Sequence, residues 1–415
     1  MESNSNSLLD SFSRSLVLNK MKSLRYGHLS FSDNDQEQSF GDEGSLLKAK
    51  IIIHDRKFYS ELIFGGSLGA AEAFMMGYWE CDDLTTIVRI LLMNRSVLDG
   101  FDSGFGSFSK PIRKFIHWCH RNTRKGSKKN ISAHYDLGND FFQSWLDEKM
   151  MYSCAIFDKQ DCGLEKASTI KLDRICKKLR LNENDHLLEI GTGWGGFAIY
   201  AAKNYGCKVT TTTISEKQYQ LAKERVEEAN LSDKITLLLE DYRDLEGQFD
   251  KLVSIEMIEA VGYQYFDDYF KKCSKLLKPE GLMVLQAITI ADQQYKYSIR
   301  SVDFIQKYIF PGGCLPSVSK IAETITEYTD MRIGTTFGHE NSLMCEIGRN
   351  ITEDDNITLN WKKKRGEDDS TIDLSYKRKL DENTSVIVTA SNPFDEIRNS
   401  VKVGYETTEG RIKSD

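Results

Sequence analysis

A glycine-rich turn after an apolar segment is the feature of this sequence that most constrains its fold. Residues 186–197 read His-Leu-Leu-Glu-Ile-Gly-Thr-Gly-Trp-Gly-Gly-Phe, so an apolar run ends in closely spaced glycines. A helix-compatible segment, 197–204, follows directly. A strand, a tight turn and a helix in this order place backbone N–H groups at a helix N-terminus, where a nucleotide-like ligand can approach closely. The pattern therefore predicts a ligand-binding strand–turn–helix unit, with a purely structural turn as the alternative.

Gly191, Gly193 and Gly196 fit the dinucleotide pattern G-x-G-x-x-G, and the next predicted strand indicates which ligand to expect. A nicotinamide-binding unit requires an acidic residue about 20 positions on, where it binds the ribose hydroxyls. The segment 207–215 carries no acid at its end, which argues against a dehydrogenase. Glu189 instead stands directly before the turn, and this E-x-G-x-G arrangement resembles the first motif of S-adenosylmethionine (SAM) methyltransferases.

The length of 415 residues is enough for two or more domains, and the composition argues against several classes of protein. A net charge of −7 argues against wholesale nucleic-acid binding. The nine cysteines include no C-x-x-C pair, so we expect reduced intracellular thiols. No metal site is expected, because His117, Cys119 and His120 form an incomplete ligand set. Since there is no signal-like N-terminus and no apolar run of ~18 residues, the protein is expected to be cytoplasmic.

Changes of pattern along the chain predict five segments. They are a flexible N-terminus (1–44), a small N-terminal domain (45–106), a basic linker (107–130), a catalytic domain (131–331) and a β-rich tail (332–415). The elements expected in the small domain are strands at 49–53 and 58–64 and helices at 68–74 and 84–93. The linker mixes basic residues with Phe115 and Trp118, which is typical either of contact with an anionic lipid surface or of a solvated connector.

The catalytic domain alternates strands with amphipathic helices, which indicates an α/β fold with a doubly wound, mostly parallel sheet. The expected strands are 187–190, 208–214, 235–239, 251–255 and 282–288, and the expected helices are 197–204, 216–229 and 265–277. Ligands of such sheets bind at the carboxyl ends of the strands. From 332 onward, apolar and polar residues alternate between polar turns, which predicts antiparallel hairpins added onto the enzyme core.

Seven ordered motifs resemble the cyclopropane-fatty-acyl-phospholipid synthase family, which includes the mycolic acid cyclopropane synthases. They lie at 134–142, 151–157, 189–196, 213–218, 241–244, 254–262 and 308–313. The resemblance implies a Rossmann-like methyltransferase fold and SAM-dependent transfer of a methylene carbon to the double bond of unsaturated acyl chains in phospholipids. The product would be a cyclopropane fatty acid. We further expect peripheral contact with the anionic inner face of the membrane, no nucleic-acid partner, and a homodimer as one possible assembly.

Carried over position by position, the resemblance implies two sets of site residues. The expected SAM contacts are Tyr152, Ser153, Glu189, Gly191, Gly193, Gly195, Thr213, Ser215, Gln218, Tyr242 and Arg243. In this family a bicarbonate ion acts as general base, and its expected holders are Cys154, Glu259, Gln286 and the backbone of Ile288. Five aromatic residues are expected either to line the acyl pocket or to belong to the ordinary core of the fold. They are Tyr263, Tyr265, Phe304, Tyr308 and Phe310.

Two departures from the family pattern leave alternatives open. Many members carry His where this chain has Gln286, and sequences with Gln there include members that methylate or methylenate the acyl chain without closing a ring. The family's closing segment, with an active-site Tyr in a His-Tyr-Ala-type motif, has no match here. The alternatives are therefore C-methylation or methylenation without ring closure, and a catalytically impaired relic that binds SAM and lipid.

Overall fold

The computed structural model divides into two compact units, residues 1–130 with 294–314 and residues 131–293 with 315–415. The described residues are 8–33, 36–103, 122–124, 126–127, 130–131, 138–159, 161–328, 332–337, 342–348, 355–363, 370–379, 384–393, 400–407 and 412–414. Most of the basic linker, the start of the motif at 134–142, and the residues His117, Cys119 and His120 lie outside these ranges.

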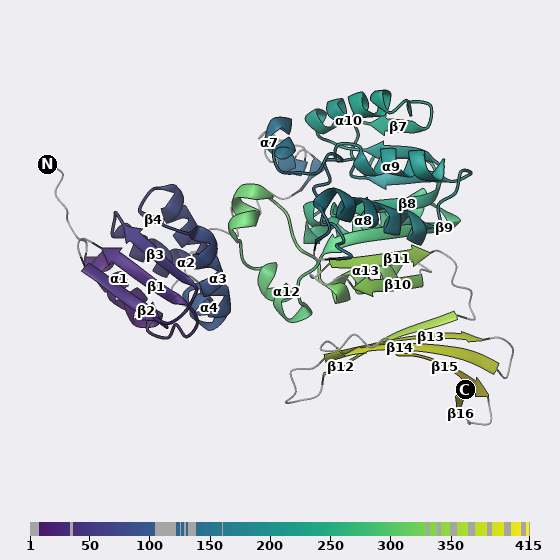
Figure 1. The fold of residues 1–415 in the computed structure, drawn as a ribbon. Helices are drawn as coiled ribbons and strands as arrows, with labels where there is room; N and C mark the ends of the chain where they lie inside the picture. Colours follow the sequence, from purple (N-terminus) through teal and green to yellow (C-terminus); the bar gives the residue numbers. More distant parts are fainter. Residues whose placement is uncertain are drawn as a thin grey trace. The chain divides into compact units, whose positions relative to one another are not determined.

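The N-terminal unit packs helices against a four-stranded sheet of order β2-β1-β3-β4 (Figure 1). Its elements are α1 (Leu8–Met21), β1 (His28–Asp33), β2 (Gln36–Gly41), β3 (Lys48–Ile53), α2 (Lys57–Met75), β4 (Trp79–Cys81), α3 (Leu84–Met93) and α4 (Arg95–Ser103). Strand β1 pairs antiparallel with β2 and parallel with β3. The core gathers side chains from helices and strands alike, and Val17, Leu29 and Tyr59 are fully buried in it.

Two expectations for this unit are wrong. The stretch expected to be flexible forms α1, β1 and β2, because apolar residues spaced along its Ser-rich sequence, such as Val17 and Phe31, are buried in the core. The strand expected at 58–64 is the first half of helix α2. A short apolar run fits a buried helix as well as a buried strand, so periodicity alone does not separate the two. The helix at 84–93 forms as expected.

The catalytic unit is built on a seven-stranded sheet of order β10-β11-β9-β8-β5-β6-β7 (Figure 1). Its strands are β5 (His186–Ile190), β6 (Lys208–Thr212), β7 (Ile235–Leu238), β8 (Phe249–Ile255), β9 (Leu277–Ile288), β10 (Arg332–Phe337) and β11 (Ser342–Gly348). Strands β5 to β9 pair in parallel, whereas β11 is antiparallel to both β9 and β10. The chain runs from β5 outward to β7 and then crosses to β8, which confirms the doubly wound α/β fold and places its switch point between β5 and β8.

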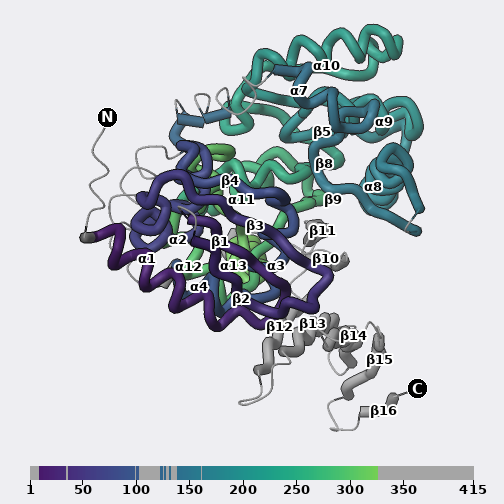
Figure 2. The backbone as a smooth tube through the Cα atoms, turned by 60° about the vertical axis from the view of Figure 1, so that its left-hand side comes forward, coloured from purple at the N-terminus to yellow at the C-terminus, as the bar shows by residue number. Residues whose placement is uncertain are grey.

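Helices cover both faces of this sheet (Figures 1 and 2). They are α8 (Leu164–Leu179), α9 (Gly196–Tyr205), α10 (Glu216–Glu228), α11 (Phe266–Leu276) and α13 (Val318–Tyr328). The short helix α7 (Asn139–Gln143) packs through Phe142 against Trp194 of the glycine turn, and α12 (Asp292–Ser298) begins in this unit and ends in the other. Successive residues of β5 point to opposite faces: Leu187 joins the core under α8 and α9, and Leu188 joins the core under α11 and α13. Among the described residues, no helix combines the length and the apolar character that a bilayer crossing requires.

The expected start of the tail at 332 is wrong, because β10 and β11 belong to the catalytic sheet. Strand β11 pairs with β9 and sets Met344 opposite Gln286. Period-2 alternation identifies a strand but not the sheet that it joins, so the sequence could not place this boundary. The later strands form a separate antiparallel sheet. They are β12 (Asp355–Lys363), β13 (Ser370–Lys379), β14 (Thr384–Pro393), β15 (Ser400–Thr407) and β16 (Ile412–Ser414).

Candidate active site

The glycine turn follows β5 directly and needs glycine for more than one reason. Gly191, Gly193 and Gly195 have φ angles of 103°, 54° and 84°, a region that L side chains rarely adopt. A Cβ added at Gly193 would meet no atom within 4 Å, so this position faces open space. A Cβ at Gly196 would lie 2.6 Å from the carbonyl oxygen of Lys149, so Gly196 serves close packing. The turn therefore offers Gly193 and its neighbours to a ligand.

Glu189 lies beneath the turn and not on its open side. Its side chain is 2% exposed, and its Oε2 accepts a hydrogen bond of 2.6 Å from the Thr211 hydroxyl. Thr211 in turn contacts Thr192 of the turn at 2.7 Å between the two hydroxyl oxygens. Burial raises the pKa of Glu189 to about 8, against the smaller opposite effects of the Thr211 hydrogen bond and of Lys171. Glu189 therefore stabilises the turn through the hydrogen bonds that link it to Thr211 and Thr192.

The end of β6 brings three of the expected SAM residues together. Ser215 is the N-cap of α10, where its hydroxyl accepts a hydrogen bond from the Gln218 N–H at 3.3 Å. The Thr213 hydroxyl donates to the Gln218 side-chain oxygen at 3.0 Å. All three side chains are buried, so this end of the sheet is preorganised. It lies beside the glycine turn, because the backbone N–H groups of Gly191 and Thr192 both donate to the Thr212 carbonyl.

Tyr242 and Arg243 follow β7 at the same edge of the sheet. The Arg243 guanidinium donates to both carboxylate oxygens of Asp241, at 2.8 and 2.6 Å, and lies 5.7 Å from the centre of the Tyr242 ring. The Tyr242 ring packs edge-on against Tyr269 in the core. These contacts fix an aromatic face and a cation near the carboxyl ends of β6 and β7.

Tyr152 and Ser153 belong to the segment that precedes α8. The Tyr152 ring packs edge-on against Phe142 and Trp145, at centroid distances of 5.5 and 5.6 Å. The Ser153 hydroxyl accepts a hydrogen bond of 2.6 Å from the Lys171 ammonium. Lys171 is fully buried, and desolvation lowers its pKa to about 8 although Glu256 opposes this shift.

A second cluster joins the ends of β8 and β9 to Cys154. The Gln286 side-chain amide donates to Glu256 Oε1 at 2.8 Å and lies 3.3 Å from the Cys154 sulfur. The backbone N–H of Cys154 donates to the same Glu256 oxygen at 3.1 Å. Glu256 has a φ of 50°, an uncommon conformation for a residue other than glycine. The structure thus holds Cys154 and Gln286 together through a strained glutamate.

Glu259 enters this cluster from the short helix η2 (Ile258–Ala260). Its Oε1 accepts a hydrogen bond from the backbone N–H of Ile288, which lies two residues after Gln286 and therefore on the same face of β9. Its Oε2 is buried and has no partner among the described residues, and the same is true of Gln286 Oε1. Desolvation raises the pKa of Glu259 to about 8, with a smaller contribution from the negative charge of Glu256.

The structure therefore brings together all four residues expected at the base site. Glu256 and Lys171 also contact the expected site residues, and the sequence analysis assigned no role to either of them. The position of Glu256 could have been predicted from the sequence, since this residue directly follows a strand at the ligand-binding edge of the sheet. The position of Lys171 could not have been predicted, because its burial depends on the packing of a helix that the sequence analysis did not expect.

The aromatic residues expected to line one acyl pocket separate between the two units. Tyr263 and Tyr265 pack against the core under α11. Phe304 and Tyr308 instead belong to the N-terminal unit, where the Tyr308 hydroxyl donates to Glu72 at 2.8 Å. The expected shared lining stays a prediction for Phe304 and Tyr308. Their position in the chain, after β9, gives no sign that this segment joins the other unit.

The doubly wound sheet, the glycine turn at the end of β5 and the acid-free end of β6 define a SAM-dependent methyltransferase. The chain belongs to the mycolic acid cyclopropane synthetase family, whose family model matches residues 122–339. This finding confirms the family resemblance and a methyltransferase of the cyclopropane synthase type.

Two sequence relatives agree with this assignment, and one solved structure is reported beside them as similar to the chain. The cyclopropane-fatty-acyl-phospholipid synthase of Escherichia coli K12 is 36% identical over 320 residues, which cover 76% of this chain and 80% of that protein. The tuberculostearic acid methyltransferase UfaA1 of Mycobacterium tuberculosis is 36% identical over 286 residues, covering 65% of this chain and 64% of the relative. Among solved structures, the cyclopropane synthase MmaA2 of M. tuberculosis is 30% identical and covers 50% of this chain and 77% of its own, with a TM-score of 0.46.

Proposed function

We propose that this enzyme transfers a methylene carbon from SAM to the double bond of an unsaturated acyl chain in a phospholipid, and so forms a cyclopropane ring. The cluster of Cys154, Glu259, Gln286 and Ile288 at the ligand-binding edge of the sheet is the observation that carries this proposal. The name of the E. coli relative supports phospholipid as the substrate class.

The residues at the edge of the sheet fit SAM. The open side of Gly193 admits close approach of a ligand, and the Tyr242 face with the buried hydroxyls of Thr213 and Ser215 can orient it. SAM, when bound, supplies a sulfonium methyl group, which the π electrons of the alkene take as the carbon–sulfur bond breaks. The packed rings of Phe142, Trp145 and Tyr152 place apolar surface next to this side of the site.

The base site fits a small oxyanion such as bicarbonate. Glu259 Oε2 and Gln286 Oε1 are buried oxygens without partners among the described residues, and the hydroxyl of a bound bicarbonate could donate to Gln286 Oε1. With its pKa raised to about 8, the Glu259 carboxyl also holds a proton near neutral pH and can donate it to an anionic oxygen. Bicarbonate, when bound, supplies the base that removes a proton from the transferred methyl group, so that the ring can close.

One incubation tests the proposal. The full chain is mixed with SAM and vesicles of an unsaturated phospholipid, and the acyl chains are then weighed and inspected by proton NMR. We expect each modified chain to gain one CH₂ and to show cyclopropane protons. Vinylidene protons would indicate methylenation without ring closure, and unmodified chains with intact SAM binding would indicate the relic.

The basic stretch between 107 and 130 supports a further proposal, peripheral contact with the anionic inner face of the membrane. Eight lysine and arginine residues lie in it, with Phe115 and Trp118 among them. The basic residues are Lys110, Arg113, Lys114, Arg121, Arg124, Lys125, Lys128 and Lys129. Basic residues close to an anionic membrane surface contribute about 1 kcal/mol each. A homodimer remains a prediction.

A further inference from the structure

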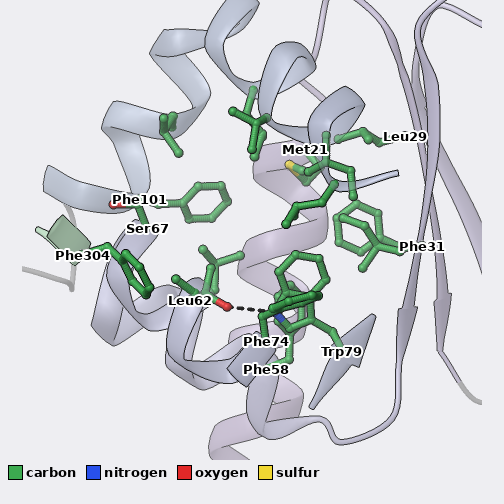
Figure 3. A pocket seen from close by; sticks show the side chains of 18 of the residues that line it. Met21, Leu29, Phe31, Phe58, Leu62, Ser67, Phe74, Trp79, Phe101 and Phe304 are labelled. Atoms are coloured by element: carbon green, nitrogen blue, oxygen red, sulfur yellow. Dashed lines mark hydrogen bonds between the residues drawn. The ribbon is translucent and has the colours of Figure 1, made fainter. Parts of the chain in front are cut away.

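The N-terminal unit contains an apolar cavity of about 590 Å³ between helices α2, α3 and α4 and the sheet. Figure 3 shows the side chains converging on it from the helices and from the strand that carries Leu29 and Phe31. Among the described residues that line the cavity, Ser67 alone has a hydroxyl and none is charged. The indole N–H of Trp79 is satisfied by the Ala70 carbonyl at 2.8 Å, so Trp79 presents carbon to the cavity.

The break in helix α2 shapes this cavity. Gly66, with φ 61° and ψ −148°, interrupts the helix, and a Cβ at Gly69 would lie 2.0 Å from the Glu61 carbonyl oxygen. The two halves of α2 therefore meet at backbone distance and form a bent wall, with Leu62 from the first half and Phe74 from the second.

The cavity opens to the surface through an apolar rim. Met75, Leu84, Val88 and Leu92 line the cavity and are also 45–59% exposed. Empty apolar cavities destabilise a fold in proportion to their volume, and exposed apolar rims mark sites of contact with lipid or protein. A space of this size falls within the usual range of about 300–1,000 Å³ for small-molecule sites.

We propose that this cavity takes up one acyl chain of a membrane phospholipid, an inference that rests on the proposed function for the identity of the substrate. A hydrocarbon chain has no hydrogen-bonding groups, which matches a lining with a single hydroxyl. A peptide strand would bring unpaired N–H and C=O groups into it, at a cost that this lining cannot offset.

The chain itself connects this cavity to the catalytic cluster. Phe304, which closes one side, lies on the segment that follows β9, the strand that carries Gln286 and Ile288. The segment is tied to helix α2 by the ion pair between Lys307 and Glu72. An acyl chain that contacts Phe304 therefore touches a segment continuous with the active site.

Photolabelling tests the inference with the full chain. Vesicles of dioleoyl phosphatidylglycerol carry a trace of the same lipid with a diazirine in its acyl chain, and adducts are mapped to peptides after irradiation. We expect adducts within residues 57–101. The variant Ala71→Phe fills part of the cavity and should lower labelling there at least about tenfold, because each CH₂ kept in water costs about fourfold in affinity. Thr85→Phe, an exposed position of α3 outside the lining, is the matched control and should label normally.

Adducts confined to the catalytic unit, or equal labelling of Ala71→Phe and Thr85→Phe, would overturn the inference. The adduct positions in the unmodified protein show whether the cavity binds the acyl chain, even if Ala71→Phe fails to fold. Acyl-chain modification, measured on the same samples, separates this inference from the proposed function. Turnover without cavity adducts overturns only the inference, and cavity adducts without turnover overturn only the proposed function.

Discussion

At the scale of single residues, glycines that look alike in the motif have different roles. Gly193 faces open space, whereas Gly196 lies against the Lys149 carbonyl. We predict that Gly193→Val weakens SAM binding strongly, because its side chain would occupy the side open to the ligand in a strained conformation. Gly196→Ala should instead destabilise the fold. Calorimetric titration with SAM and thermal unfolding separate the two, and unchanged SAM affinity in Gly193→Val would remove the turn from the site.

Glu259 gives a sharper test of the base site. Glu259→Gln keeps an acceptor for the Ile288 N–H but removes the acid, so SAM affinity should persist while turnover falls about 10²–10⁴-fold, as for loss of a positioned acid–base group. Glu259→Ala should lose at least as much and recover partly with added bicarbonate. The exposed Glu228→Gln, on α10, is the control and should retain near-normal turnover. Near-normal turnover of Glu259→Gln without a bicarbonate response would contradict the assignment.

The same residue predicts how stability changes with pH. The pKa of Glu259 is raised from its ordinary 4.5 to about 8, so its contribution to stability is fully present below pH 4.5 and is lost as pH rises through 8. The thermal midpoint of the unmodified protein should therefore fall relative to that of Glu259→Gln between pH 5 and pH 8. Glu189 titrates in the same direction but is present in both proteins, so it cancels in the difference. A constant difference across this range would show that Glu259 is not buried as described.

At the scale of elements, β11 decides where the catalytic domain ends. It pairs with β9 along the stretch that carries Gln286 and Ile288, and β10 pairs with its other side. Without both strands, β9 would become an edge with unpaired N–H and C=O groups beside the active site. The prediction of a dispensable tail therefore applies only after Gly348.

Two truncations test this boundary. A chain ending at Asn350 should bind SAM with unchanged affinity, because β12 to β16 form a sheet of their own. A chain ending at Met331 should aggregate or lose SAM binding. Calorimetry and size-exclusion chromatography distinguish these outcomes, and equal SAM binding by both truncated chains would show that β10 and β11 are not needed.

At the scale of the whole molecule, the proposed membrane contact predicts a response to salt. Screening shortens the reach of exposed charges from about 10 Å at 0.1 M to about 3 Å at 1 M, so co-sedimentation with anionic vesicles should fall over this range. The double variant Lys128→Gln with Lys129→Gln should bind more weakly at low salt. Lys271→Gln with Lys275→Gln, on α11, removes the same charge elsewhere and is the control. If vesicle binding does not change with salt concentration, apolar surfaces such as the rim of the N-terminal cavity make the contact.

The catalytic fold could be predicted because its signals are local. The glycine turn, the alternation of strand and helix around 186–288 and the absence of an acid after β6 depend on neighbours in the chain, and they predicted the sheet and its ligand-binding edge. Family motifs then implied Cys154, Glu259 and Gln286. In the structure Cys154 and Gln286 meet around Glu256, and Glu259 accepts a hydrogen bond from the Ile288 N–H at the end of the same strand.

The remaining features depend on residues far apart in the sequence, and only the tertiary structure decided them. The left-handed backbone of Glu256 and the burial of Lys171 follow from packing against other segments. The N-terminal cavity requires Phe304 to meet helices more than two hundred residues earlier in the chain. The membership of β10 and β11 in the catalytic sheet depends on pairing with β9. A local pattern predicts which face of an element is apolar, but which partner covers this face depends on long-range packing.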